Sequence, residues 1–391
     1  MEQLLNLQTH NFCCVEKPIS DHGGKPLTLD EGIQILVDGR EFTHGRFTGI
    51  ARVLQGLTES LAESALCKHV LLAVHDTLAV PSGLKATAKV SLKEVTMSFL
   101  KSEKALSHQS RRFDLYISPY PKLPFFGVHC RAIHIVHDVL DLTHPLYKRR
   151  LKALFDRYRL RKALRRADIT WYDSLWSMAE TQKHFGRCGR NPRVRCPGID
   201  TAFEPENKNE DTAVLKAYGL ETGYILTLGN GLPHKNLGIL LEIAPQIGRP
   251  IVFAGVSEDH QRYWESRYHG MSGKWISHVE EQHLPALLRG AFCVAQPSLV
   301  EGYGYPPLEA MACGRPAIVS RIPVLVETTG NCALSAPPNE PTAWRDALNA
   351  LENTARYDEI VEKGLRWTEP LRGRRAWRPY LADIENLMKG S

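Results

Sequence analysis

The sequence PSLVEGYGYPPLEAMACGRP at residues 297–316 is the most informative stretch of this 391-residue chain. Short apolar, β-prone runs precede it at residues 292–296 and follow it at residues 317–319, which predicts two parallel strands joined by a loop and a helix. Proline is favoured in the first turn of a helix and glycine just beyond its end. The helix is therefore expected to begin at the pair Pro306-Pro307 and to end at Gly314.

This arrangement places Glu309 in the first helical turn and Glu301 in the loop before it. Gly302 and Gly304 allow the backbone to approach a ligand closely, and the amides of a helix N-terminus attract anions. A carboxylate beside them is suited to accept hydrogen bonds from hydroxyls, such as those of a ribose. A simpler interpretation stays open for a single glutamate: Glu309 complements the helix dipole, which is worth roughly 0.3–1 kcal/mol.

The length and composition of the chain limit the classes of protein that it can be. With 43% hydrophobic residues in 44.0 kDa, it has enough apolar material for two domains with separate cores. No run of about 18 apolar residues predicts a membrane span, and residues 1–18 lack the basic start and apolar core of a secretion signal. The nine cysteines form no CxxC pair, which favours reduced thiols and a cytoplasmic location.

Apolar, β-prone runs recur along the chain with helical spacing between them, which predicts an α/β protein with parallel sheets covered on both faces. In the first half the expected strands lie at residues 33–38, 70–74, 115–117, 132–136, 169–172 and 194–196, and in the second half at 224–228, 251–254, 275–279, 292–296 and 317–319. The expected division is an arm at 1–31, a first domain at 32–197, a linker at 198–222, a second domain at 223–370 and a C-terminal helix within 371–391 that packs back on the first domain.

A second glycine-containing loop, GNGLPHKN at residues 229–236, follows the first strand of the second half. It is not a dinucleotide fingerprint, because the third glycine of GxGxxG would fall at His234, and it is not a P-loop. Lys235 nevertheless stands beside glycines where a helix begins, which suits a diphosphate, and such a charged hydrogen bond is worth roughly 1.5–3 kcal/mol. Asn236 is expected to cap that helix.

His137 follows the strand expected at residues 132–136, at the strand end where open α/β sheets bind ligands. His134 lies three residues earlier and points to the opposite face, so the two cannot readily share a metal. A purely structural role for His137 stays open. The sequence contains no DxD pair, HExxH, GxSxG or Walker motif, so neither a metal nor a bound cofactor is predicted.

Positive charge is concentrated between residues 147 and 166, where ten Lys and Arg residues accompany one acid, Asp156. Apolar residues keep helical spacing in the same segment, at Tyr147, Leu151, Leu154, Phe155 and Tyr158. A basic amphipathic helix suits an anionic membrane surface or a phosphate-bearing acceptor, although a solvated face is an open alternative. No aromatic interleaving or known motif favours nucleic acid. The candidate acceptor or membrane residues are Arg46, Arg149, Arg150 and Arg157.

Taken together, these motifs resemble those of the retaining glycosyltransferases of family 4, over about residues 33–370. Glu301 and Glu309 have the spacing of the E-x7-E motif of that family. The loop at residues 229–236 resembles its glycine loop, with His234 where arginine is commoner. The pair His137-Asp138 resembles its HD pair, and residues 45–52 resemble its first glycine loop.

This resemblance implies a GT-B fold, in which a Rossmann-like acceptor domain and a Rossmann-like nucleotide-sugar domain face each other across a cleft. It implies catalytic roles for His137, Lys235 and Glu301. Glu309 would bind the ribose hydroxyls, Lys235 would neutralise the diphosphate, and His137 would reach the sugar. The donor-binding residues implied by the resemblance are Gly49, Gly229, Asn230, His234, Lys235, Val279, Gly302, Tyr303, Gly304 and Glu309.

The implied reaction is a metal-independent transfer of a hexose, with mannose favoured, and with retention of configuration. GDP-mannose or a UDP-sugar would be the donor. From the basic helix we predict that the acceptor is a saccharide or a polyprenyl-diphosphate-linked saccharide at the inner membrane face, in cell-surface polysaccharide or lipopolysaccharide biosynthesis. Two alternatives stay open: another GT-B enzyme, such as a nucleotide-sugar epimerase or a phosphorylase, and a non-catalytic subunit that binds a nucleotide sugar.

Overall fold

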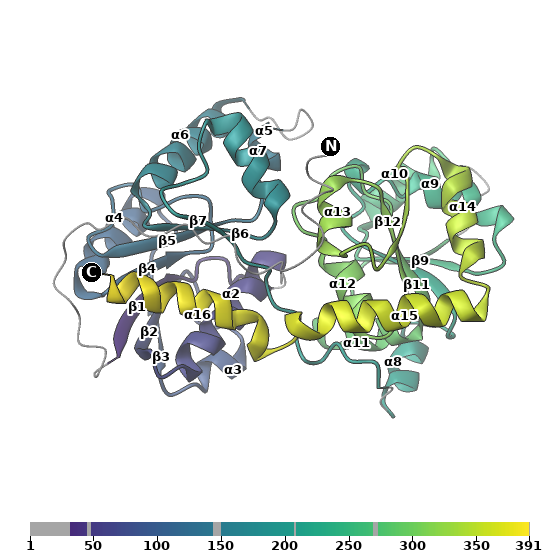
Figure 1. Ribbon diagram of the computed structural model, residues 1–391, viewed down its shortest axis with the longest axis horizontal. Helices are drawn as coiled ribbons and strands as arrows, with labels where there is room; N and C mark the ends of the chain where they lie inside the picture. Colours follow the sequence, from purple (N-terminus) through teal and green to yellow (C-terminus); the bar gives the residue numbers. More distant parts are fainter. Residues whose placement is uncertain (1–31, 45–47, 144–149, 207–208, 269–272, 391) are drawn as a thin grey trace. The chain divides into compact units, whose positions relative to one another are not determined.

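The computed structural model describes residues 32–44, 48–143, 150–206, 209–268 and 273–390 (Figure 1). The described residues divide into two compact units, one formed by those up to Pro197 together with those from Trp377 onward, and the other by those from Gly198 to Ala376. Each unit is a parallel sheet with helices packed against it, as the alternating strand and helix pattern predicts. The arm expected at residues 1–31 lies outside the described residues.

The first unit contains a seven-stranded sheet with the order β3-β2-β1-β4-β5-β6-β7. Its strands are β1 (Ile33–Asp38), β2 (Cys67–Val74), β3 (Val90–Glu94), β4 (Leu115–Ser118), β5 (Arg131–Val136), β6 (Ile169–Tyr172) and β7 (Pro192–Val194). Every pairing is parallel, and on β1 Ile35 lies opposite both Val70 and Leu115. The strand order reverses between β1 and β4, and open α/β sheets bind ligands beyond the carboxyl ends of the strands at such a reversal.

Helices cover both faces of this sheet. They are α2 (Gly49–Glu63), α3 (Ser82–Lys85), α4 (Phe99–Gln109), η2 (Ser110–Arg112), α5 (Leu140–Thr143), α6 (Arg150–Arg166), α7 (Leu175–Phe185) and α16 (Arg374–Lys389). Figure 1 shows α6 and α7 on one side of the sheet and α2, α3 and α16 on the other. Thr48 caps α2 by accepting a hydrogen bond from the Ala51 amide at 3.1 Å, and the apolar stripe of α2 is buried.

The second unit contains a six-stranded parallel sheet with the order β10-β9-β8-β11-β12-β13. Its strands are β8 (Tyr224–Leu228), β9 (Ile251–Ala254), β10 (Lys274–Ile276), β11 (Ala291–Gln296), β12 (Ala317–Ser320) and β13 (Leu334–Ala336). Its helices are α8 (Asp211–Ala217), η3 (Pro233–Lys235), α9 (Gly238–Ile243), η4 (Ala244–Gln246), α10 (Glu258–Glu265), η5 (Glu281–His283), α11 (Leu284–Gly290), α12 (Tyr305–Ala312), α13 (Pro323–Thr328), α14 (Pro341–Ala350), α15 (Thr354–Thr368) and η6 (Glu369–Leu371). The strand order reverses between β8 and β11.

Residues 198–222 are not the linker that the polar composition predicts. Ile199, Phe203, Leu215 and Leu220 are buried in the core of the second unit, and the Ile199 amide donates to the Leu371 carbonyl at 2.8 Å. These apolar residues are spaced among polar ones, so the average composition of the segment hides its contribution to the core. The chain passes between the units after Pro197 and again after Ala376.

The C-terminal helix α16 packs within the first unit. The Trp377 indole fills the space beside Gly56, where an added Cβ would lie 2.5 Å from its ring. Asp383 accepts hydrogen bonds from the Trp171 indole at 2.8 Å and from Arg195, and Tyr380 donates to the Arg195 carbonyl at 2.7 Å. These buried polar contacts attach the end of the chain to β6 and to the residue that follows β7.

Candidate functional site

Two loops meet at the strand-order reversal of the second unit. Residues 229–236 follow β8 and residues 297–304 follow β11, and these neighbouring strands place Leu226 opposite Val294. Both loops therefore leave the same edge of the sheet, where open α/β folds bind ligands. The Leu299 amide donates to the His234 carbonyl at 2.8 Å and joins the two loops directly.

A partly buried ion pair forms the centre of this site. The Lys235 ammonium lies 2.7 Å from Glu301 Oε1, and the two side chains are only 16% and 11% exposed. Gln296 Nε2 and Ser298 Oγ donate to the same oxygen, each at 2.6 Å. The sequence patterns predicted Lys235 and Glu301 but not the two neutral donors, which come from the end of β11 and the residues after it.

These contacts determine the charge of Glu301. Burial alone would raise the pKa of its carboxyl group, but the Lys235 ammonium and the Ser298 hydroxyl hold that pKa below its ordinary value. Glu301 is therefore a carboxylate at neutral pH. A hydroxyl that approaches the free lone pairs of this carboxylate would find an acceptor that is already fixed in position.

Helix α12 begins beside the ion pair, one residue earlier than the proline pair indicated. Gly304 precedes it with φ 94°, and a Cβ at this position would lie 2.4 Å from Leu325 Cδ2, so the turn requires glycine. Because α12 begins at Tyr305, Glu309 is its fifth residue and lies outside the first turn, contrary to the expectation. Glu309 is also 1% exposed, which does not fit a surface carboxylate that only complements the helix dipole.

The loop after β8 is shaped by its glycines and two asparagines. Gly231 has φ 72°, and an added Cβ would lie 2.6 Å from Val256 Cγ1. The Asn230 side chain accepts from the Leu232 amide at 3.2 Å, which closes a turn. Asn236 is not the helix cap that the sequence indicated. It has φ 54°, and its side-chain Nδ2 donates to the backbone carbonyls of Pro297 and Pro338 at 3.1 and 2.7 Å.

The remaining residues expected to bind the donor differ in whether their side chain or only their backbone is available to a ligand. Gly229 follows β8 directly, and its amide donates to the Ala254 carbonyl at 3.0 Å. The Tyr303 side chain is buried in the core and packs against Tyr305, so only its backbone can face a ligand, as Gly302 can. Val279 follows β10 and packs against the same core.

In the first unit, His137 lies just beyond the carboxyl end of β5, as expected. Its Nδ1 is 2.6 Å from Asp173 Oδ2 and its Nε2 is 3.0 Å from the Pro119 carbonyl oxygen. Burial opposes the charged ring, but Asp173 and the carbonyl raise the pKa of His137 above its ordinary value of 6.5. Both ring nitrogens are thus engaged within the first unit, and an imidazolium that donates to both acceptors satisfies this geometry.

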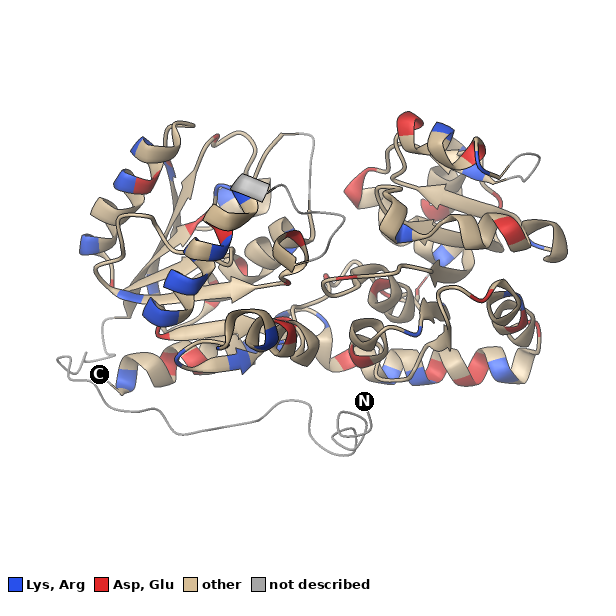
Figure 2. Cartoon of the chain, turned by 90° about the horizontal axis from the view of Figure 1, so that it is seen from above, with Lys and Arg blue, Asp and Glu red and all other residues tan. Residues whose placement is uncertain are grey.

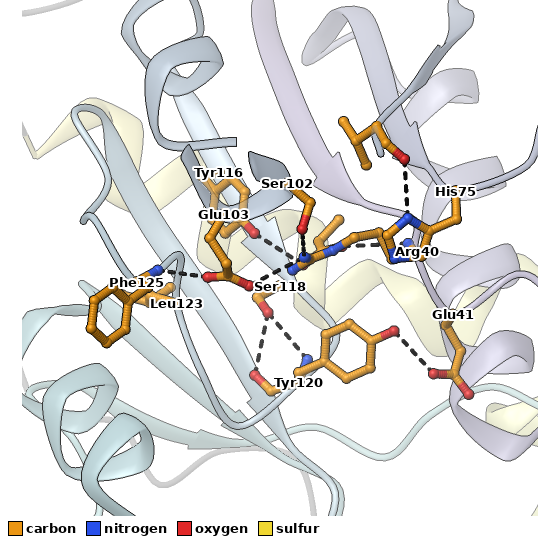
Figure 3. A network of polar contacts seen from close by, with 12 residues as sticks. Arg40, Glu41, His75, Ser102, Glu103, Tyr116, Ser118, Tyr120, Leu123 and Phe125 are labelled. Atoms are coloured by element: carbon orange, nitrogen blue, oxygen red, sulfur yellow. Dashed lines mark hydrogen bonds and ion pairs between the residues drawn. The ribbon is translucent and has the colours of Figure 1, made fainter. Parts of the chain in front are cut away.

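A second polar network lies at the strand-order reversal of the first unit, and the sequence patterns did not indicate it. Figure 3 shows Arg40 among the carboxylate and hydroxyl groups of neighbouring elements. Arg40 pairs with Asp38 at 2.7 Å and with Glu103 at 3.1 Å, and Glu103 also pairs with Arg159 of α6 at 2.6 Å. The signal was a charged residue, Asp38, at the end of a strand that is apolar apart from Gln34.

The residues expected to form an acceptor or membrane surface are only partly described. Arg46 and Arg149 lie outside the described residues, and so does the side chain of Arg150 at the start of α6. Arg157 donates to the Leu142 carbonyl at 3.2 Å and stacks over the Phe185 ring, so it binds α6 to its neighbours. Gly49 is the first residue of α2 and is exposed.

Within residues 32–44, 48–143, 150–206, 209–268 and 273–390, no group of three or more His, Cys, Asp and Glu side chains could hold a metal ion. None of the helices in these ranges is long and apolar enough to cross a membrane.

Comparison with known proteins confirms the resemblance inferred from the two loops. Residues 222–353, which contain both loops, match the family Glycosyl transferases group 1. The chain is 29% identical over 247 residues to O-antigen chain mannosyltransferase B of Escherichia coli, and it is 30% identical over 136 residues to O-antigen chain mannosyltransferase RfbU of Salmonella typhimurium. The matches cover 60% and 33% of this chain, and they span 65% and 38% of the two relatives.

Solved structures share the two-domain fold at low sequence identity. HepE of Anabaena in complex with UDP-glucose has a TM-score of 0.72 at 15% identity, over 91% of this chain and 99% of that one. WaaG, a glycosyltransferase involved in lipopolysaccharide biosynthesis, has a TM-score of 0.67 at 15% identity, over 90% of this chain and 99% of that one. The fold class is therefore that of the GT-B glycosyltransferases, as the resemblance implied.

Proposed function

We propose that this chain, in which residues 222–353 form a glycosyl transferases group 1 domain, transfers a hexose from a nucleotide-diphosphate sugar during the assembly of a cell-surface polysaccharide. The observation that carries the proposal is the Lys235–Glu301 pair, fixed by Gln296 and Ser298 where the strand order reverses. It combines a cation for a diphosphate with a carboxylate for sugar hydroxyls, at the edge where this class of sheet binds nucleotides.

In this proposal each group has one task. The Lys235 ammonium binds the diphosphate and stabilises the negative charge that develops as the glycosidic bond breaks. Glu301, which Lys235 and its neutral donors keep ionised, orients the hydroxyls of the transferred sugar. The buried carboxylate of Glu309 accepts the ribose hydroxyls, and the backbone at Gly302 and Tyr303 approaches the phosphate because Gly304 turns the chain sharply.

The acceptor hydroxyl attacks from the face that the nucleotide leaves, and the departing phosphate oxygen takes its proton, so the configuration is retained. The protein then needs no nucleophile of its own. His137, for which the resemblance implies a role at the transferred sugar, is held as an imidazolium by Asp173 and the Pro119 carbonyl. Metal independence belongs to the same proposal, because Lys235 supplies the positive charge for the leaving group.

Mannose is the favoured sugar, and GDP-mannose the favoured donor, because two relatives are named mannosyltransferases of O-antigen chains. A UDP-sugar is the second candidate, since HepE binds UDP-glucose with the same fold. A saccharide carried on a polyprenyl diphosphate is the favoured acceptor. Work on such an acceptor would take place at the cytoplasmic face of the membrane.

A thermal-shift panel of nucleotide sugars tests the donor. GDP-mannose is expected to raise the unfolding temperature in proportion to the logarithm of its concentration, because only the folded chain binds it. Lys235→Met should abolish the shift, while the matched variant Lys216→Met, an exposed lysine on α8, should keep it. A full shift in Lys235→Met would contradict the assignment of the site.

A transfer assay separates this proposal from the two alternatives. Incubation of the donor with and without a lipid-linked saccharide should give a mannosylated product only when the acceptor is present, with an α-linkage if the donor linkage is α. Conversion of the donor to another nucleotide sugar without acceptor would indicate an epimerase, and consumption of the donor by inorganic phosphate would indicate a phosphorylase. Binding without any turnover would indicate a non-catalytic subunit.

A further inference from the structure

The first unit exposes a contiguous group of apolar side chains, most of them aromatic, which we call the aromatic face. It comes from the start of α4, the segment between β4 and β5, and α6. Its members are Phe99 (42% exposed), Phe125 (half-buried), Phe126 (49%), Leu154 (64%), Phe155 (37%) and Tyr158 (55%). Met97 and Leu100, at 77% and 59%, add exposed apolar area beside Phe99.

The rings of the aromatic face touch across the three segments. The Phe99 and Phe155 centroids are 5.9 Å apart, and Phe125 lies 6.1 Å from Phe155 and 5.4 Å from Phe126. Leu154, Phe155 and Tyr158 lie on one side of α6 because of helical spacing. Helix α6 packs on the first unit through other residues, Leu160, Ala163 and Leu164, so the aromatic face is additional to its buried stripe.

Positive charge surrounds the aromatic face. Helix α6 has eight Lys and Arg residues and one acid, Asp156. Arg159 lies 5.5 Å from the Phe99 ring, and Lys162 donates to the Phe125 carbonyl at 2.7 Å. Lys101 and Lys104 of α4, with Lys152, Arg161, Arg165 and Arg166 of α6, are exposed.

The acids of these two helices do not cancel this charge. Glu103 is buried and already paired with Arg40 and Arg159, which leaves Asp156 as the acid at the surface of α4 and α6 within the described residues. Figure 2 shows that blue positions dominate several helices of the first unit, whereas blue and red alternate along α15 of the second.

We propose that the aromatic face and the cations around it dock the first unit onto an anionic lipid bilayer. Aromatic rings partition into the headgroup region, while Lys and Arg beside them are attracted to anionic lipids within about a Debye length. Charge of one sign around an apolar centre complements a uniformly anionic surface; a folded protein partner would usually present both signs. The inference rests on the proposed function only in that a lipid-linked acceptor has to be reached at a membrane.

The test is sedimentation of the full chain with vesicles of phosphatidylcholine alone or with added phosphatidylglycerol. Binding should require the anionic lipid and should fall with salt. Phe155→Ser should weaken binding by about tenfold, since the exposed part of one aromatic ring no longer enters the interface. Leu78→Ser is the matched control, because Leu78 is 74% exposed in the same unit but lies outside the aromatic face.

A second pair of variants tests the charge. Lys152→Glu should weaken binding by about fivefold for the lost cation and further for the added anion. Lys216→Glu changes the net charge equally on the second unit and should leave binding unchanged. Because Lys152 and Lys216 are both exposed, circular dichroism should show that these charge variants fold.

Three results would overturn the inference: no binding to anionic vesicles, equal binding by Phe155→Ser and the parent chain, or equal losses in the two charge variants. Concentration-dependent dimerisation that Phe155→Ser abolishes, without vesicle binding, would identify the face as a contact between copies and would also overturn it. The nucleotide-sugar thermal shift, measured on the same variants, shows separately whether the proposed function fails.

Discussion

The Lys235–Glu301 pair permits a quantitative test by a double-mutant cycle. Lys235→Met removes the ammonium and keeps a long apolar side chain, and Glu301→Gln removes the charge and keeps the shape. The two groups are 2.7 Å apart and largely buried, so the pair is screened little by solvent. Removing one partner leaves the other charged group buried without its counter-ion.

The expected cost follows from the remaining contacts. Removing one partner of a buried pair costs about 3–5 kcal/mol of stability. In Lys235→Met, however, Gln296 and Ser298 still donate to Glu301 Oε1, which reduces the expected loss to about 2–3 kcal/mol. The double variant has no unpaired charge, so its loss should be smaller than the sum of the single losses, with a coupling of ~1.5–3 kcal/mol.

The pH dependence has a definite sign. Because the folded-state pKa of Glu301 is lowered, its ionisation adds stability that is present above the ordinary pKa of 4.5 and is lost as pH falls through the folded-state value. The difference in stability between the parent chain and Lys235→Met should therefore be largest near neutral pH. It should shrink in acid, below pH 4.5.

Urea unfolding of the four proteins at pH 7 and pH 4 measures both effects. Arg249 and Glu352 provide the control cycle, because they are 2.6 Å apart but 30% and 52% exposed. That exposed pair should show a coupling of about 0–1 kcal/mol. Equal couplings in the two cycles, or a Lys235→Met loss that does not change between pH 7 and pH 4, would refute the argument.

Three further predictions concern other parts of the chain. His137 has a raised pKa, so its contribution is complete below pH 6.5 and is lost at higher pH; urea midpoints of the parent chain and His137→Gln should converge as pH rises from 6 to 9. Gly304→Ala should destabilise by about 2–4 kcal/mol, because it adds a clash to a left-handed φ, whereas Gly186→Ala, with φ 73° and open space, should cost only ~1 kcal/mol in the same urea experiment. Asp383→Ala should destabilise the first unit by roughly 3 kcal/mol, since the Trp171 indole and Arg195 lose their acceptor, and a fluorescence change confined to the second unit would contradict this.

The sheets could be predicted from the sequence because most of their strands are buried on both faces. The first and last residues of four strands were predicted as observed, because continuous apolar runs are typical of central parallel strands. These strands are 33–38, 169–172, 224–228 and 251–254. The strands that were missed, β3 and β13, lie at the edges of their sheets, and β3 ends in Lys93 and Glu94. Edge strands bury less surface, so their sequences carry a weaker signal. At the other edge of the first sheet, the strand predicted at 194–196 lies instead at Pro192–Val194.

The structure brings the two loops of the predicted site together and adds contacts that the sequence did not indicate, while the site itself stays a prediction. Spacing within a loop gave Glu301 and Lys235 as candidates, but it could not show that they pair, because they are 66 residues apart. Their contact depends on the position of β8 beside β11, which follows from the strand order and not from either loop alone. The roles of Gln296 and Ser298 depend on the same packing.

The two units place similar chemistry at the same position of the fold. In each sheet the order reverses beside its first strand, and in each a cation from the loop after that strand pairs with a carboxylate from a more distant segment: Lys235 with Glu301, and Arg40 with Glu103. The difference lies in how many partners each cation has. Arg40 binds Asp38, Ser102 and Glu103 together, so four of the five N–H donors of its guanidinium are used within the protein. For Lys235 the described ion pair is with one carboxylate, and an ammonium with three donors can add a phosphate oxygen without giving up that pair. This difference favours the second unit as the one that binds the charged donor.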